Sequence, residues 1–151
     1  MHIRQQTLND ISTCLNENGC NYSVFLRAYT TPRRARSVSS QLIADALARA
    51  DVVAEEIRAV SAIEAISETR SCLTYIGSQA DGPDPASLRS AQFTNALAAL
   101  ASQIESAAHR AISVETFRLA SGHPAYPVFW DFGLLITGAN EAEMLIGSSS
   151  D

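Results

Sequence analysis

The first predicted element is a helix over residues 3–18, because apolar residues recur there at close to helical spacing. Gly19 follows at the position where a glycine commonly ends a helix. The apolar positions of this helix are Ile3, Leu8, Ile11 and Leu15. Aromatic and β-branched residues then dominate residues 20–30, which predicts a strand, with a helix as the alternative. One face of that strand would carry Tyr22, Val24, Leu26 and Ala28.

The segment 37–75 contains no glycine or proline and is rich in alanine, which favours helix. It is predicted to form one long helix, or two helices with a break near Ser67-Glu68-Thr69. Ser37 or Ser39 would cap its start. The carboxylates on it would form solvated helix surface; they are Glu55, Glu56, Glu64 and Glu68.

Glycine and proline return at 77–85, which marks a loop. Asp84 followed by Pro85 is typical of a helix start, with aspartate as the N-cap and proline at the first helical position. Apolar residues continue at helical intervals after it. A helix is therefore predicted over about 85–111.

The pattern changes to β-like at Ile112. Strands are predicted for 112–119, 128–137 and 142–146, joined as an antiparallel meander. The middle one is apolar on both faces, which is typical of a central strand covered on two sides. Gly147 to Asp151 reads as a polar tail.

Helices and strands thus fall into separate runs, which indicates an α+β fold with helices packed on one face of a small, mainly antiparallel sheet and a C-terminal three-stranded meander. The chain of 151 residues suits a single globular domain over 1–151.

The formal net charge of -5 disfavours a nucleic-acid surface, because the phosphate backbone needs a basic patch. No apolar run has the length of a signal peptide or a membrane span, so we expect a cytoplasmic protein that does not bind membranes. The chain has no lysine, which excludes a P-loop or a Schiff-base mechanism. Its three cysteines form no CxxC motif, and its three histidines are far apart, so no metal and no cofactor are expected.

The most unusual segment is 122–131, which combines two prolines, a histidine, an aspartate and the only tryptophan. Tyr126, Trp130 and His123 are candidate binding residues, because rigid amphipathic rings suit contact surfaces. His123 and Asp131 are also candidate catalytic residues, with His123 carrying a proton and Asp131 orienting it. The alternative is a structured turn that leads into a central strand. A buried Asp131 would then need a partner, for which Arg118 is the candidate.

A second candidate is the arginine group Arg33, Arg34 and Arg36, which precedes the predicted long helix. Guanidinium groups near a helix N-terminus suit a phosphate or carboxylate. The alternative is a solvated loop whose arginines pair with acidic neighbours.

These observations favour a non-catalytic protein-binding module, for example a toxin-neutralising or adaptor protein. The alternative is a small-molecule-binding enzyme or sensor with a pocket near His123 and Asp131. Close packing of the alanine-rich helices of two copies would give a homodimer.

Overall fold

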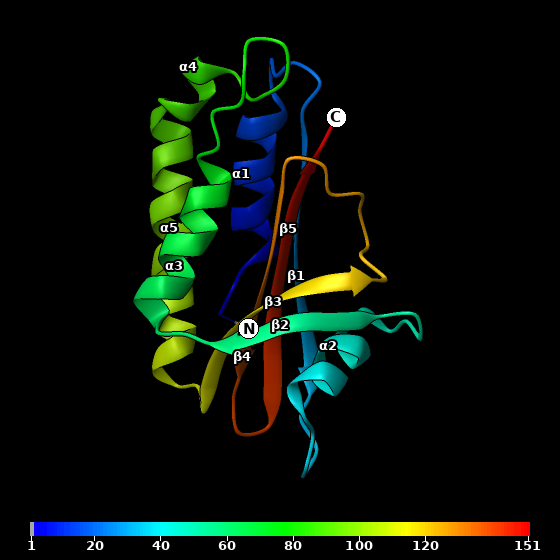
Figure 1. Ribbon diagram of the computed structural model, residues 1–151. Helices are drawn as coiled ribbons and strands as arrows, with labels where there is room; N and C mark the ends of the chain where they lie inside the picture. Colours follow the sequence, from blue (N-terminus) through cyan, green and yellow to red (C-terminus); the bar gives the residue numbers. More distant parts are fainter. Residues whose placement is uncertain (1) are drawn as a thin grey trace.

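The computed structural model describes residues 2–151. Its elements in chain order are α1 (Gln5–Asn16), β1 (Ser23–Pro32), α2 (Ser39–Leu47), β2 (Val53–Ala59), α3 (Ala62–Leu73), α4 (Pro85–Leu88), α5 (Ala91–His109), β3 (Ser113–Ser121), β4 (Trp130–Thr137) and β5 (Glu141–Ser150). The strands form one antiparallel sheet in the order β1-β5-β4-β3-β2 (Figure 1). The α+β class and the C-terminal meander of β3, β4 and β5 are confirmed.

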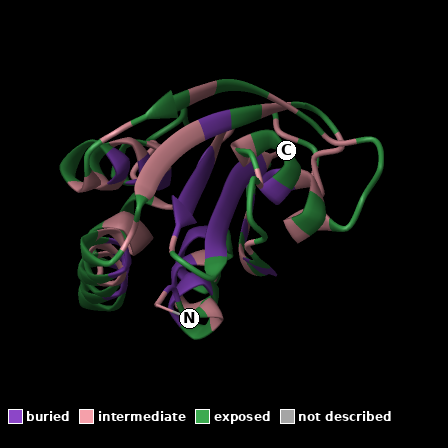
Figure 2. Cartoon of the chain, turned by 90° about the horizontal axis from the view of Figure 1, so that it is seen from below, coloured by how far each residue is buried: buried purple, intermediate pink, exposed green. Residues whose placement is uncertain are grey.

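The sheet has helices on both faces. Helices α1, α3 and α5 pack on one face, where Leu8, Leu73 and Leu100 join the larger core. Helix α2 lies on the opposite face, and its Leu42 and Ile43 contact a smaller core. Buried residues gather where the strands meet the helices (Figure 2). Every helix within residues 2–151 is too short or too polar to span a bilayer.

The middle strand of the five is β4, as its sequence predicts. Leu134 and Ile136 face the larger core, whereas Leu135 between them faces α2 and the smaller core. Both odd and even positions of β4 are apolar because each face of the strand is covered.

The segment 37–75 corrects the prediction of one or two helices, because a strand interrupts it. Helix α2 ends where Ala48 adopts a left-handed conformation, at φ 52°. Strand β2 then runs along β3. A capping box at Ser61 starts α3: the Ser61 hydroxyl accepts from the Glu64 amide, and the Glu64 carboxylate accepts from the Ser61 amide. The expected break near 67–69 lies inside α3 and is wrong. The cap at Ser37 or Ser39 is also wrong, since Val38 holds that position without a side-chain hydrogen bond.

Smaller corrections concern the ends of other elements. Helix α1 is capped by Glu17 rather than ended by Gly19, and Asn18 takes the left-handed conformation. The helix predicted for 85–111 is divided into α4 and α5 by a new N-cap at Ser90, although Asp84 caps the start as predicted. The predicted polar tail is wrong, because residues 147–150 complete β5; within it, Ser148 and Ser149 are 1% exposed.

Helix α1 covers part of the outer edge of β1 with its side chains. The Gln5 amide accepts from the Ala28 backbone N–H and donates to the Leu26 carbonyl. Asn16 Oδ1 accepts from the Val24 N–H at 2.7 Å. Side chains of a helix therefore take the hydrogen bonds that a further strand would make.

Candidate functional site

Strands β3 and β4 separate part of the way along the sheet. Their pairing runs from Ser113↔Thr137 to Phe117↔Gly133 and stops there. Beyond that point β3 follows β2, while β4 follows β5 (Figure 1). We call the opening between 118–121 of β3 and 130–132 of β4 the fork.

The local sequence explains why the strands part. The β2–β3 register shifts between Glu55 and Arg58, and Glu56 in that shift has φ 51°. Such a bulge increases the twist of a strand pair and turns it away from its neighbours. On β4, Gly133 has no side chain, and the Phe117 ring lies over it. The last paired position of the two strands thus has an aromatic ring against bare backbone.

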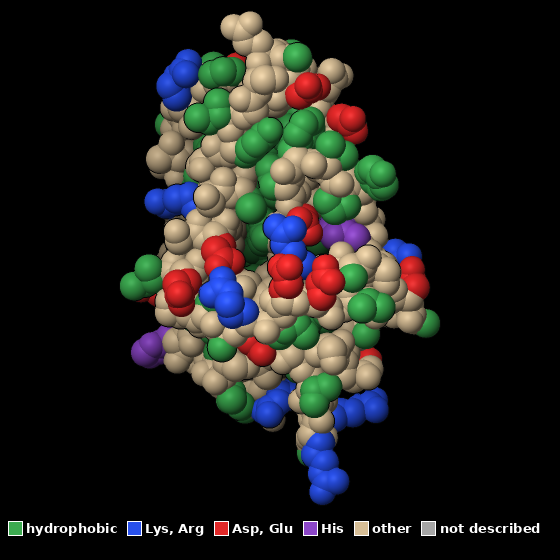
Figure 3. Space-filling model, viewed as in Figure 1, with side chains coloured by type: hydrophobic (Ala, Val, Ile, Leu, Met, Phe, Trp, Pro, Cys, Tyr) green, Lys and Arg blue, Asp and Glu red, His purple; other side chains and the backbone are tan. Residues whose placement is uncertain are grey.

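A cavity of about 690 Å³ lies at the fork, between β2, β3, β4 and helix α3. Its apolar walls come from Ile57, Phe117 and Phe132. The space-filling view shows a hollow in the middle of this face, with hydrophobic surface inside it and charged side chains of both signs around it (Figure 3). The charged lining residues are Glu56, Arg58, Glu68, Arg118 and Asp131.

Arg118 and Asp131 face each other across the fork. Arg118 Nη1 lies 3.5 Å from Asp131 Oδ1, which confirms Arg118 as the partner of this aspartate. Glu56 approaches the same guanidinium from the other side, at 3.6 Å from Nε. The Asp131 side chain is 19% exposed and that of Arg118 is 56% exposed, so the carboxylate is the more enclosed of the two.

A second ion pair lies among the residues that line the cavity. Arg58 of β2 contacts Glu68 of α3 through Nη2 and Oε1. This pair joins the edge strand to the helix layer. The prediction placed both Glu56 and Glu68 on the solvated surface of one long helix or of two helices; instead they come from a strand and a helix and line one cavity.

Cys72 also lines the cavity, from α3. Burial raises the pKa of its thiol to about 11, with the Asp131 charge adding to the effect and Arg118 opposing it. The thiol is therefore protonated at neutral pH, and a protonated thiol is a poor nucleophile.

His123 lies on the loop between β3 and β4, and the structure does not join it to Asp131 by a hydrogen bond. Its Nδ1 lies 2.9 Å from the Ala125 amide nitrogen and 3.1 Å from the Ala125 carbonyl oxygen, so both contacts of this atom stay within the loop. The ring packs edge-on against Phe25. Burial lowers the pKa of His123, although the Ala125 backbone and the Asp131 charge partly oppose this. Its geometry is that of a neutral side chain that fixes the loop.

Tyr126 and Trp130 have different environments. Tyr126 is 79% exposed at the tip of the loop. Trp130 is partly buried, stacks on Phe132 and donates from Nε1 to the Tyr22 hydroxyl at 2.8 Å. The tryptophan thus packs within the structure, and the tyrosine is the accessible ring of this segment.

The three arginines of the predicted anion site differ in their surroundings. Arg33 continues the edge of β1, where its backbone N–H donates to Asn140 and its Nη1 to the Gly138 carbonyl at 3.4 Å. Arg34 and Arg36 are exposed, and all three precede the first residue of α2, Ser39.

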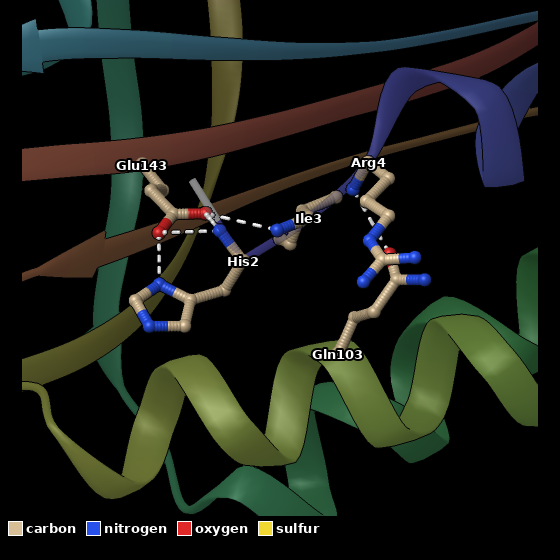
Figure 4. Close-up of polar contacts among 5 residues, drawn as sticks. All are labelled: His2, Ile3, Arg4, Gln103 and Glu143. Atoms are coloured by element: carbon tan, nitrogen blue, oxygen red, sulfur yellow. Dashed lines mark hydrogen bonds and ion pairs between the residues drawn. The ribbon is translucent and has the colours of Figure 1, made fainter.

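A buried carboxylate far from the fork holds the N-terminal segment in place (Figure 4). Glu143 of β5 accepts from the backbone N–H groups of His2 and Ile3 and contacts His2 Nδ1 at 2.5 Å. Gln103 of α5 accepts from the Arg4 N–H beside it. Burial raises the pKa of Glu143, but the bonds from His2 and Ile3 lower it by more, so the pKa lies below its usual value.

The sequence analysis missed both strand β2, which lines the cavity, and the His2–Glu143 contact, for different reasons. The segment Ser61-Ala62-Ile63-Glu64 is a capping-box signature, and it could have divided the presumed long helix and revealed β2. Nothing in the sequence indicates the His2–Glu143 contact, because 141 residues separate the two.

Among residues 2–151, no three His, Cys, Asp or Glu side chains gather as metal ligands would.

The chain matches no known family model, no curated protein and no solved structure.

Proposed function

We propose that the protein binds a small organic molecule in the cavity at the fork. The observation that carries this proposal is that β3 and β4 stop pairing at Phe117↔Gly133, where a cavity of about 690 Å³ lies between β2, β3, β4 and α3. Small-molecule sites typically have roughly 300–1,000 Å³, apolar walls and a few convergent polar groups. The fork has that composition, with Phe117 and Phe132 as walls and Arg118 and Asp131 as polar groups.

The residues at the fork support binding rather than catalysis. The Cys72 thiol is protonated at neutral pH, and the fork-lining Asp131 faces Arg118 rather than a histidine. His123 uses Nδ1 to fix its own loop. A carrier or sensor of a small molecule needs only the shape and charges that this cavity offers.

The test uses a fragment mixture that contains cations, anions and neutral molecules, observed by ¹H–¹⁵N NMR. Binding at the fork is expected to shift the amides of β3 residues 116–118 and β4 residues 131–133. Ser71→Trp places a large side chain into the cavity from an exposed position of α3 and should abolish these shifts. Ser106→Trp, at an exposed position of α5 that does not line the cavity, should leave them unchanged.

A second candidate function is protein binding by the loop at 122–129. The loop is fixed: His123 accepts from the Ala125 amide, and Val128 N–H donates to the Ser149 carbonyl at 2.7 Å. Tyr126 and Val128 are nevertheless 79% and 45% exposed. Ordered apolar side chains in solvent lose little entropy on binding a partner, as in a toxin-neutralising or adaptor protein.

This candidate is tested by affinity capture from the source cell, followed by direct binding of the purified partner. Tyr126→Ala should weaken that binding by about tenfold or more, as a central aromatic contact does. The control is Ile63→Ala, at an exposed position of α3. Tyr29 is not used as a control because it packs against the smaller core. Equal affinity of wild type and Tyr126→Ala would exclude the loop as the contact surface.

A further inference from the structure

The charges at the fork do not balance. Arg58 and Glu68 contact each other directly and neutralise each other. The remaining lining charges are one guanidinium, Arg118, against two carboxylates, Glu56 and Asp131. The cavity therefore has an excess of one negative charge before any ligand is present. An excess of negative charge in a partly enclosed cavity favours a cation over an anion.

Within residues 2–151, the Asp131 carboxylate receives no side-chain hydrogen bond. Its contact with Arg118 Nη1 is 3.5 Å long, beyond the usual range of a charged hydrogen bond. A carboxylate can accept at about four lone-pair positions, and enclosing it without donors costs free energy. Asp131 is thus an acceptor whose capacity is open on the side of the cavity.

The walls next to this acceptor are apolar and aromatic. Phe117, Phe132 and Ile57 line the cavity, and the protonated Cys72 adds no charge to it. Aromatic faces attract cations as well as apolar groups. The space therefore suits an apolar body that ends in a donor-rich cationic group.

We propose that the ligand of the fork is a small organic amine, bound as its ammonium. The proposal rests on the proposed function of the cavity and specifies its ligand. The ammonium donates to Asp131, and Glu56 adds a longer-range attraction. The hydrocarbon body lies against Phe132 and Ile57. The ammonium competes with Arg118 Nη1 for Asp131, whereas Arg118 Nε keeps its contact with Glu56 at 3.6 Å.

The experiment compares three probes of similar size that differ in charge: 2-phenylethylammonium, 2-phenylethanol and 3-phenylpropionate. Each is titrated into the full chain, and affinity is measured from ¹H–¹⁵N NMR shifts of amides at the fork. The ammonium is expected to bind about tenfold or more tightly than the alcohol, since a charge-assisted bond to a carboxylate is worth that difference. The carboxylate probe is expected to bind most weakly.

Two variants connect this preference to the fork. Asp131→Asn should reduce the affinity for the ammonium about tenfold and leave the alcohol unchanged. Glu56→Gln changes a side chain that is 71% exposed and should reduce the affinity for the ammonium about two- to threefold. This second variant keeps the test valid if Asp131→Asn unfolds. Asp10→Asn on α1 removes the same charge outside the cavity and should have no effect.

The remaining outcomes overturn the amine proposal. Tighter binding of 3-phenylpropionate that is lost in Arg118→Met would show an anion site at the same fork. Equal binding of all three probes would show that the cavity does not recognise charge. Either result would leave the proposed function standing. No binding of the ammonium, together with fork shifts from other fragments, would also reject only the amine. No fragment of any charge at the fork would reject the proposed function itself.

Discussion

The Arg118 guanidinium and the Asp131 carboxylate lie 3.5 Å apart across the fork, at positions where β3 and β4 no longer pair. A charge contact between side chains thus takes the place of the backbone ladder. The contact is long, and the arginine is more than half exposed, so water and ligands can compete for both groups. A pair of this kind contributes little to stability and leaves its charges available for binding.

The first prediction follows from that weakness. Asp131→Asn is expected to change the free energy of unfolding by less than about 1 kcal/mol, because half-exposed ion pairs contribute little. Urea denaturation followed by the fluorescence of Trp130 measures this value. A loss of several kcal/mol would show that the pair holds the fold together and would make the variant unsuitable for binding studies.

The second prediction concerns the position where strand pairing ends. A Cβ added at Gly133 would lie 2.6 Å from Phe117 Cε2 and Cζ. Gly133→Ala should therefore reduce stability by about 1–3 kcal/mol, the usual cost of overpacking. Gly138→Ala is the control, since its Cβ would approach a single atom, the Glu141 carbonyl oxygen, at 3.1 Å. Equal stability of the two variants would mean that the Phe117 ring moves aside freely.

The third prediction is a loss of stability in acid through Glu143. Its folded-state pKa lies below the ordinary value of 4.5, so its contribution is complete above that value and is lost as the pH falls through the folded pKa. Glu143→Gln should be less stable than wild type at pH 7 by about 1–3 kcal/mol, since two backbone amides and His2 lose a charged acceptor.

Urea unfolding at intervals from pH 3 to pH 7 tests this. The stability of wild type should fall below about pH 4.5 more steeply than that of Glu143→Gln. Parallel curves for the two proteins would contradict the assignment of the acid sensitivity to this carboxylate.

The fourth prediction orders the three thiols by reactivity. Cys20 is exposed, Cys72 is partly enclosed with a thiol pKa raised to about 11, and Cys14 is buried. Alkylation at pH 8 should modify Cys20 first and the enclosed Cys72 and Cys14 much more slowly, because the thiolate is the reacting form and burial raises the pKa of both enclosed thiols. Peptide mass spectrometry after short exposures to iodoacetamide gives the order. Rapid modification of Cys72 would contradict the enclosed environment at the fork.

The C-terminal half could be predicted well because its patterns are local. Apolar residues on both parities of β4 require a strand covered on two faces, and the Asp84-Pro85 pair marks a helix start. Even the Arg118–Asp131 pair follows from the need of an enclosed carboxylate for a cation.

The middle of the chain misled the prediction because alanine and the absence of glycine favour helix locally, whereas β2 forms through its pairing with β3, some 60 residues away. The cavity depends on that pairing and on the bulge at Glu56. Local propensity contains no information about either, so the site could be predicted only in part: Asp131 and Arg118, but not Glu56, Arg58 or Glu68.

The contacts of Gln5 and Asn16 with β1 protect this border of the sheet from pairing with other chains. A foreign strand that approached β1 would first have to displace three hydrogen bonds that α1 already makes. The opposite border, β2, is bent by its bulge and bears Glu55, Glu56 and Arg58, which disfavour a flat neighbour. Growth of a fibril through strand pairing is thus opposed at β1 by backbone groups that are already hydrogen-bonded and at β2 by curvature and charge. The protein should therefore tolerate high concentration without its sheets joining edge to edge.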